Sequence, residues 1–255
     1  MQRLRNKVAI ITGAASGIGA GTAEVFAEEG AKLVLVDRDQ AALATICDRL
    51  SAINPDIVAC LGDVADRKTA ERAVQLAVGS FGGIDVLFNN AGIMTYGDFT
   101  ELTDEGWDSL LSINLRGFYL FSHAVVPKML ERGGGAIVNT SSAMAWVTEP
   151  GYEAYTTSKA GIIGLTKALA VSYAEQGIRA NAILPGWVDT PLNQRLAEGL
   201  GGLDKLTPII KQQQPLPRMI SPREIGYLVC FLASDEAKAI TGAAIPIDGA
   251  ASAAI

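Results

Sequence analysis

Residues 8–19 read Val-Ala-Ile-Ile-Thr-Gly-Ala-Ala-Ser-Gly-Ile-Gly, an apolar run that passes directly into a glycine-rich turn. The segment after it is predicted to be a helix whose apolar face includes Val25 and Phe26. Glycines let backbone N–H groups approach a pyrophosphate closely, and the helix N-terminus adds about half a positive charge. The spacing from Gly13 to Gly19 is Gly-x3-Gly-x-Gly, not the common Gly-x-Gly-x2-Gly. The stretch predicts a dinucleotide-binding turn, with a tight turn that binds nothing as the alternative.

Short β-branched runs alternate with helical patterns along the whole chain. Their near-continuous apolar character, without period-two alternation, is typical of strands buried on both faces, as in a parallel sheet between two helical layers. We therefore predict a single-domain, Rossmann-type, doubly wound α/β fold of seven parallel strands flanked by helices, spanning residues 1–255. The predicted strands are Val8–Thr12, Lys32–Asp37, Ile57–Leu61, Ile84–Phe88, Ala136–Thr140, Arg179–Leu184 and Ala244–Ile247.

Local signals mark where the intervening helices begin and end. Ser221, followed by proline and then Glu224, forms a predicted capping box at the start of a helix. The polar stretch Lys211–Pro222 is predicted to be a mobile loop, too short to separate two domains. Asp39, Asp66 and Thr103 are predicted N-caps, and Gly30 and Gly177 are predicted helix ends.

Composition excludes several classes of function. The net charge is -6 and the Lys and Arg residues are scattered, which argues against a nucleic-acid partner. No apolar run is long enough to span a membrane, and residues 1–5 lack the apolar core of a signal peptide, so we expect a cytoplasmic protein. The single histidine, His123, and three widely spaced cysteines, Cys47, Cys60 and Cys230, indicate free thiols and no metal site.

Asp37 ends the second predicted strand, where an acidic residue meets a ribose 2′-hydroxyl in dinucleotide-binding folds. A carboxylate there repels a 2′-phosphate and favours NAD, although the adjacent Arg38 could still accommodate phosphate. Asp63 and Val64 follow the third predicted strand and could border the adenine, or form an ordinary loop.

Tyr155 and Lys159 lie four residues apart in a helical segment, so both project from one face. A free phenol has a pKa near 10 and is a poor base at neutral pH. An ammonium about 4 Å away at an effective dielectric of about 20 favours the phenolate by roughly 4 kcal/mol, which would lower the pKa of Tyr155. In isolation, however, such a pair is usually found on a helix surface.

Several motifs in order resemble the short-chain dehydrogenase/reductase family over nearly the whole chain. They are Thr12-Gly13-x3-Gly17-Ile18-Gly19, Asn89-Asn90-Ala91-Gly92, Asn114, Ser142, Tyr155-x3-Lys159 and Pro185-Gly186. The resemblance implies a nicotinamide cofactor near the point where the strand order reverses. One departure is Ala250 after Asp248-Gly249, where many members have a second glycine, which bears on assembly more than on chemistry.

Roles carried over from the family are expectations for this chain. Ser142, Tyr155 and Lys159 would be catalytic, and Asn114 would bend a helix and connect the lysine to solvent through water. Asn90 and Gly92 would stabilise the sheet and contact the cofactor. The expected cofactor-binding residues are Gly13, Ser16, Gly17, Ile18, Gly19, Asp37, Arg38, Asp63, Val64, Asn90, Ala91, Gly92, Tyr155, Lys159, Pro185, Gly186, Val188 and Thr190.

The expected substrate pocket mixes aromatic walls with few fixed charges. The family pattern lines it with Met94, the segment Ala143–Trp146 (including Met144), Glu149, Gly151, Tyr152 and Trp187, below a flexible lid at about 190–217. Such a pocket suits a neutral secondary alcohol, such as a polyol, sugar derivative or alicyclic alcohol. A small hydroxy acid would fit if Arg195, Lys205 or Lys211 turned inward, whereas such cations usually face water.

The sequence thus indicates an NAD-dependent oxidoreductase that interconverts a secondary alcohol and its ketone, with Tyr155 as the acid/base. The family resemblance also suggests a homotetramer. Alternatives are an NADP-dependent carbonyl reductase, an epimerase or dehydratase using the same pair, and a non-catalytic NAD-sensing regulator. The regulator could lack the tyrosine, lysine or serine, and all three are present.

Overall fold

The computed structural model describes residues 2–254, which form one parallel sheet with helices on both faces. The strand order is β3-β2-β1-β4-β5-β6-β7, and every neighbouring pair is parallel. The strands are β1 (Val8–Thr12), β2 (Lys32–Asp37), β3 (Ile57–Leu61), β4 (Val86–Asn89), β5 (Gly135–Thr140), β6 (Ile178–Pro185) and β7 (Ala244–Ile247). The predicted fold class is confirmed.

The helices fill the connections between strands. They are α1 (Gly17–Glu28), α2 (Gln40–Ser51), α3 (Arg67–Phe81), α4 (Asp104–Leu111), α5 (Gly117–Glu131), α6 (Glu153–Tyr173), α7 (Pro191–Gly199), α8 (Leu203–Gln213) and α9 (Pro222–Ala233). A π-helical turn, η2 (Ser112–Arg116), joins α4 to α5. Short 3₁₀ turns are η1 (Phe99–Glu101), η3 (Ala143–Ala145), η4 (Ala174–Gln176), η5 (Asp235–Ala237) and η6 (Ala251–Ala253).

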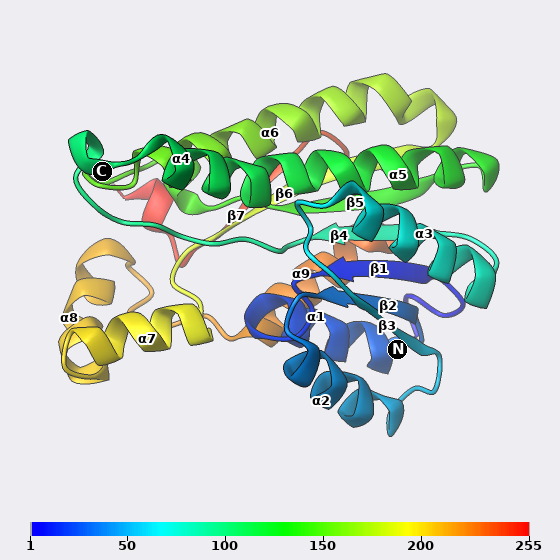
Figure 1. Cartoon of the computed structure of the whole chain (residues 1–255), viewed down its shortest axis with the longest axis horizontal. Coiled ribbons are helices and arrows are strands. Elements are labelled where there is room, and N and C mark those ends of the chain that lie inside the picture. The colour runs from blue at the N-terminus through cyan, green and yellow to red at the C-terminus, as the bar shows by residue number, and fades with distance from the viewer. Residues whose placement is uncertain (1, 255) are drawn as a thin grey trace.

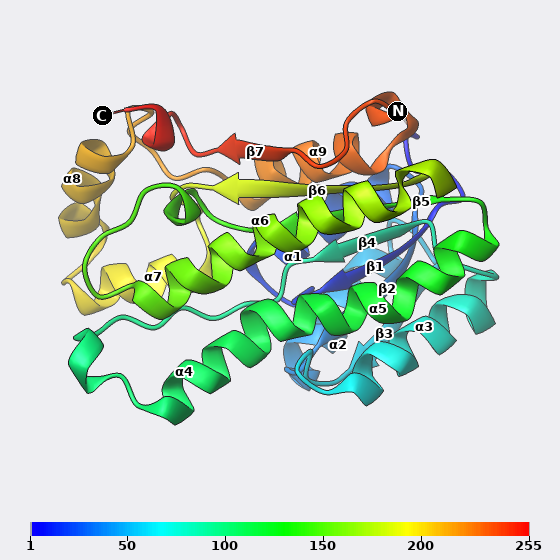
Figure 2. The same ribbon diagram turned by 90° about the horizontal axis from the view of Figure 1, so that it is seen from above.

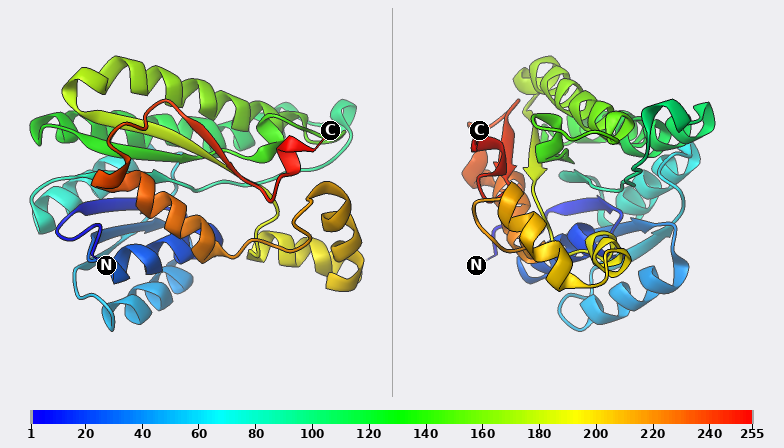
Figure 3. Two further views of the ribbon diagram at one scale, coloured as in Figure 1. Left: turned by 180° about the vertical axis from the view of Figure 1, so that it is seen from behind. Right: turned by 90° about the vertical axis from the view of Figure 1, so that its left-hand side faces the viewer.

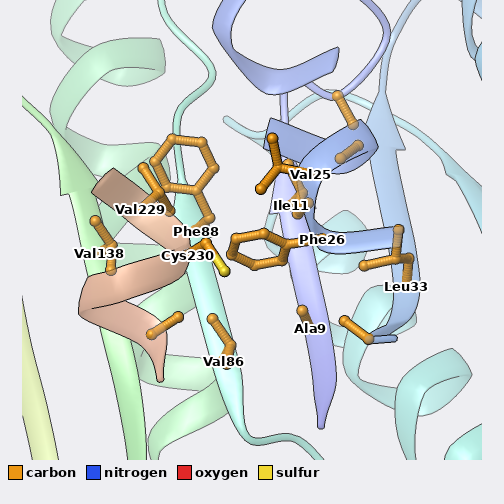
Figure 4. Close-up of a cluster of buried hydrophobic side chains, with 14 of the residues drawn as sticks. Ala9, Ile11, Val25, Phe26, Leu33, Val86, Phe88, Val138, Val229 and Cys230 are labelled. Carbon is orange, nitrogen blue, oxygen red and sulfur yellow. The ribbon is translucent and has the colours of Figure 1, made fainter. Parts of the chain in front are cut away.

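Two hydrophobic cores hold the layers together. Helices α1, α2 and α9 cover one face of the sheet, and α3, α5 and α6 cover the other (Figures 1 and 3). On the first face, Phe26 of α1 and Cys230 of α9 lie over Phe88 of β4 (Figure 4). All three side chains are fully buried, so the strands are enclosed on both sides, as their continuous apolar runs predict.

Helices α1 and α9 approach each other closely because glycines face the contact. A Cβ added to Gly21 would lie 2.5 Å from the Cβ of Pro222, and one added to Gly226 would lie 3.0 Å from the Gly21 carbonyl oxygen. Larger side chains would force the helices apart. This contact fixes the start of α9 against the helix that follows the glycine-rich turn.

The predicted strand limits agree closely with the structure except at β4. That strand begins at Val86, not Ile84. The Asp85 backbone still donates to the Val8 carbonyl oxygen and accepts from the Ala136 N–H, both at 2.9 Å, and its carboxylate accepts from the Val8 N–H at 2.8 Å and from Arg132 Nε at 3.0 Å. The predicted capping groups are confirmed, including both bonds of the Ser221 capping box. Gly30 and Gly177 both adopt positive φ, as helix-terminating glycines do.

The segment after β6 differs from the predicted mobile loop at Lys211–Pro222. Lys211 to Gln213 form the last turn of α8, and Gln214 is fully buried. The break between α7 and α8 falls at Gly201 and Gly202, whose φ values are 96° and 116°. The two helices lie beyond the end of the sheet toward which β6 and β7 point (Figure 2). Within residues 2–254, no helix is both long and apolar enough to cross a membrane.

Replacing Gly21 with valine should lower the free energy of unfolding by about 1–3 kcal/mol, because the new side chain must push Pro222 away. Gly79, inside α3, is the matched control, since a Cβ there meets nothing within 4 Å. Gly79→Ala should raise stability by up to about 1 kcal/mol. Urea denaturation measures both; equal effects of the two variants would contradict this account of the α1–α9 contact.

Candidate active site

A cavity of about 630 Å³ lies at the carboxyl ends of the central strands. Most of the residues predicted to form the site line it, although they come from every part of the chain. These are Gly13, Ser16, Gly17, Ile18, Asp37, Asn90, Ala91, Gly92, Met94, Ser142, Ala143, Met144, Glu149, Tyr152, Tyr155, Lys159, Pro185, Gly186, Trp187, Val188 and Thr190. Gly19, Arg38, Asp63, Val64 and Asn114 do not line it.

The glycine-rich turn has the shape of an anion cradle. Gly13 and Gly17 adopt φ values of 63° and 52°, which other residues rarely reach. A Cβ on Gly19 would collide with the Gly13 carbonyl oxygen, so this glycine is needed for the helix to start so close to the strand. Helix α1 begins at Gly17 with no side-chain cap on its free N–H groups. Such an uncapped N-terminus suits the pyrophosphate of a dinucleotide.

Asp37 stands at the end of β2 with its carboxylate held in place. Its Oδ2 accepts from the Ala15 N–H at 2.9 Å, and its Oδ1 accepts from the Asp39 N–H at 3.0 Å. Each carboxylate oxygen retains a lone pair that can accept from a ribose hydroxyl. The neighbouring Arg38 is exposed and lies outside the cavity wall.

Asp63 and Val64 lie away from the cavity for separate local reasons. The Asp63 Oδ1 accepts from the Ala65 N–H at 2.8 Å and closes a turn. Val64 is buried, and a Cβ on Gly117 would lie 3.2 Å from one of its methyl groups. Val64 therefore packs against the start of α5.

Asn90 joins three strands at the floor of the cavity. Its Nδ2 donates to the carbonyl oxygens of Thr12 at 3.1 Å and Gly13 at 3.3 Å. Its Oδ1 accepts from the Thr140 hydroxyl at 3.4 Å. These bonds connect the ends of β1, β4 and β5, in agreement with the sheet-stabilising role expected for this residue.

Lys159 is buried beside Tyr155 on α6. Its Nζ donates to the Thr140 carbonyl oxygen at 3.0 Å and lies 5.6 Å from the centre of the Tyr155 ring. The side chain of Ser141 fixes the lysine backbone by donating to the Lys159 carbonyl oxygen at 2.7 Å. Ser142, also nearby, accepts from the Met144 N–H at 3.1 Å. The structure therefore brings the three expected catalytic side chains to one wall of the cavity.

Asn114 supports this wall from behind. It lies in the π-helical turn η2 and is fully buried. Its amide makes two 2.8 Å hydrogen bonds with the backbone of Ile93, and its Nδ2 also donates to the Ser158 hydroxyl at 3.2 Å. A Cβ on Gly92 would lie 3.3 Å from Asn114 Oδ1 and 3.5 Å from Lys159 Nζ, so these two groups face the same glycine.

Burial dominates the electrostatics of the pair. It raises the pKa of Tyr155 above its usual value, and the Ser142 hydroxyl opposes this shift only in part. Burial also lowers the pKa of Lys159 to about 8. The expectation that the lysine alone lowers the tyrosine pKa is therefore wrong for the protein without its cofactor. Desolvation, which helical spacing does not reveal, is the largest influence on the tyrosine pKa, and Lys159 is not among the groups that shift it.

The cavity also contains residues that the sequence did not assign to the site individually, although Pro191, Leu192, Asn193, Gln212 and Gln213 fall within the expected lid at about 190–217. Of the expected pocket residues, Trp146 is half exposed and, like Ala145 and Gly151, does not line the cavity. Arg195 lines it, whereas Lys205 and Lys211 do not. The additional lining residues are Ile93, Thr140, Ser141, Val147, Thr148, Pro191, Leu192, Asn193, Gln212, Gln213, Ala251 and Ala254.

Most of these additional residues carried no chemical motif that could have revealed them. Ala251 and Ala254 belong to the apolar C-terminal segment, which reaches the cavity of its own chain. Thr140 is the exception. It ends a predicted strand two residues before Ser142, so the sequence could have placed it beside the catalytic serine.

Comparison with known proteins finds a family model described as enoyl-(acyl carrier protein) reductase that matches residues 13–251. The chain is 41% identical to oxidoreductase UcpA of Salmonella typhimurium over 252 residues, 98% of this chain and 95% of that protein. It is 38% identical to cyclohexanol dehydrogenase of an Acinetobacter species over 249 residues, 97% of this chain and 96% of the relative.

Solved structures agree with the fold over the whole chain. Levodione reductase matches with a TM-score of 0.94 at 36% identity, covering 99% of this chain and 100% of its own. L-sorbose reductase from Gluconobacter frateurii, complexed with NADPH and L-sorbose, also matches with a TM-score of 0.94, at 32% identity and with 100% of both chains covered.

The buried lysine makes the stability of the protein depend on pH. Because the folded pKa of Lys159 is about 8, against 10.5 normally, the unfolded chain binds more protons between these values. The free energy of unfolding should therefore rise with pH across this range, by roughly 3 kcal/mol from this residue alone. Urea denaturation should show that the free energy of unfolding rises more between pH 7 and pH 10 in the wild type than in Lys159→Met. Lys167→Met, on the exposed side of α6, should retain the larger rise.

Proposed function

The chain belongs to the short-chain dehydrogenase/reductase family and is an NAD(P)-dependent alcohol dehydrogenase or ketone reductase, and we propose that it oxidises neutral secondary alcohols with NAD. The observation that carries this proposal is the position of Tyr155, Lys159 and Ser142. They line one wall of a single cavity that runs from the glycine-rich turn to Trp187.

The cofactor would extend along this cavity. The turn Gly13–Gly19 and the N-terminus of α1 would bind the pyrophosphate, and Asp37 would accept from the adenosine ribose. Gly186, Val188 and Thr190 would contact the nicotinamide end, with Lys159 on its ribose. In support, the glycine backbone is shaped for close approach, and the Asp37 carboxylate is fixed by two backbone N–H groups.

Bound NAD would accept the hydride that leaves the alcohol carbon and supply positive charge beside the phenol. Tyr155 would take the hydroxyl proton as the C=O bond forms, and Ser142 would orient the same oxygen. With a pKa of about 8, Lys159 is mostly protonated at neutral pH and can favour the phenolate. In the reverse direction, Tyr155 would return the proton to the forming alkoxide.

The walls of the substrate end favour a neutral alcohol, and an alicyclic one in particular. Met94, Val147, Tyr152, Trp187 and Leu192 supply apolar and aromatic surface. Rings of this kind fit apolar walls with one polar end directed at the catalytic groups. The name of the Acinetobacter relative, cyclohexanol dehydrogenase, supports the same substrate class.

The segment 190–217 would act as the substrate lid, and the chain would assemble as a homotetramer. In support of the lid, α7 and α8 share a small core of their own, built on Ala197, Leu206 and Ile210. In support of assembly, Tyr119 on α5 and Val171 on α6 expose 43% and 84% of their surface.

The proposed reaction is tested with purified protein, NAD or NADP, and a panel of cyclic alcohols, polyols and hydroxy acids, followed by absorbance of the reduced cofactor. We expect turnover of neutral cyclic alcohols with NAD. Tyr155→Phe should lower kcat by at least about 100-fold while NAD binding persists, because only the proton-transfer group is lost. Tyr152→Phe removes another phenol from the cavity and should keep kcat within about tenfold. Retained turnover in Tyr155→Phe would refute the assignment.

An NADP-dependent reductase is the competing proposal, supported by the NADPH in the L-sorbose reductase structure. Asp37→Asn should lower the ratio of kcat/KM for NAD to that for NADP by about tenfold or more, because it removes the charge that repels a 2′-phosphate. Asp39→Asn is the matched control, since it removes a nearby exposed charge and keeps an N-cap for α2. An unchanged ratio in Asp37→Asn would exclude this role.

A further inference from the structure

Three side chains from separate segments form one hydrogen-bonded chain at the outer end of the cavity. The indole Nε1 of Trp187, after β6, donates to Gln213 Oε1 at 2.9 Å. Gln213, at the end of α8, donates through Nε2 to the Glu149 carboxylate in the connection between η3 and α6. All three residues line the cavity. Their hydrogen bonds link the end of α8 to Trp187 on one side and to the segment before α6 on the other.

The chemistry of the end groups fixes the direction of this chain. An indole N–H can only donate, so it must face the oxygen of the Gln213 amide. The amide nitrogen then faces Glu149, and an ionised carboxylate can only accept. Gln213 therefore holds the negative charge of Glu149 at a defined position.

The carboxylate acts on the cavity wall. Burial is the main cause of the raised pKa of Tyr152, and the charge of Glu149 is the next. No ion pair to Glu149 occurs in the part of the chain that the structure describes. No ion pair therefore neutralises the charge of Glu149. This charge lies where the end of a substrate remote from the reacting carbon would bind.

Arg195 is the cation that could oppose this effect. It lines the same cavity from α7, but it is exposed, and within residues 2–254 its side chain makes no ion pair with the protein. Lys159, the other lining cation, donates to Thr140 at the catalytic wall. Glu149 is exposed as well, but Gln213 holds its carboxylate in place, whereas Arg195 has no fixed partner in residues 2–254, so the outer end favours exclusion of negative charge.

Building on the proposed oxidation of neutral alcohols, we propose that Glu149, positioned by Gln213, is a specificity-determining residue that rejects substrates carrying a carboxylate remote from the reacting carbon. Neutral alcohols and ketones are admitted. Like charges about 6 Å apart at an effective dielectric of about 40 change binding about tenfold, which sets the expected selectivity.

The test compares two ketones of nearly equal shape, 4-oxocyclohexanecarboxamide and 4-oxocyclohexanecarboxylate. Each is titrated into the full-length protein with oxidised NAD, a combination that binds without turnover, and tryptophan fluorescence or calorimetry gives the Kd. The wild type should bind the amide about tenfold more tightly than the carboxylate. Glu149→Gln keeps an oxygen that accepts from Gln213 and should bring the two Kd values within about twofold.

Two further variants separate this role from general effects. Gln213→Ala releases Glu149 and should reduce the preference for the amide. Glu198→Gln removes a charge from α7 outside the cavity wall and should leave the preference unchanged. The proposal is overturned if Glu149→Gln keeps the wild-type preference, if Glu198→Gln abolishes it equally, or if the wild type fails to bind the amide. Turnover of cyclohexanol by the wild type separately decides the proposed function.

Discussion

The hydrogen bonds of Asn90 span the gap on which the whole site depends. After β1 the chain enters α1 on one face of the sheet, and after β4 it continues to α5 on the other, so the ends of these neighbouring strands diverge. Asn90 bridges the divergence by donating to the carbonyl oxygens of Thr12 and Gly13, while accepting from Thr140. One amide thereby sets the glycine-rich turn at a fixed distance from β5.

The same arrangement explains how a charged lysine is kept under the cavity. Burial works against the ammonium form of Lys159, and the Thr140 carbonyl supplies a partner in partial compensation. Because Thr140 also bonds to Asn90, the position of the ammonium is tied to the cofactor end of the site. The charge beside Tyr155 is thus fixed by the sheet and not only by α6. A buried lysine that retains most of its charge at neutral pH suits the acid/base role that we propose for Tyr155.

The sequence predicts those parts of the fold that depend on local chemistry. The limits of β1, β2 and β3 follow from uninterrupted apolar runs, and the capping box at Ser221 follows from hydrogen bonds within one turn. The sequence does not predict features that depend on contacts between segments far apart in the chain. The Asp85 carboxylate bonds to Val8 and Arg132, which are distant in sequence, and the pKa of Tyr155 depends on burial by many segments. Neither effect can be derived from residue spacing.

The three consecutive glutamines Gln212–Gln214 have the same side chain but different roles, because each one has different neighbours. Gln214 is fully buried: its Oε1 accepts from the Trp187 N–H, and its Nε2 donates to two carbonyl oxygens, so all of its bonds hold the base of α8. The adjacent Gln213 points to the cavity and meets Glu149, and Gln212 is exposed at its rim. The end of α8 is therefore anchored to Trp187, Leu216 and Arg218, independently of the bond between Gln213 and Glu149. Substitutions at the outer end can change selectivity while Tyr155 and its supports stay in place.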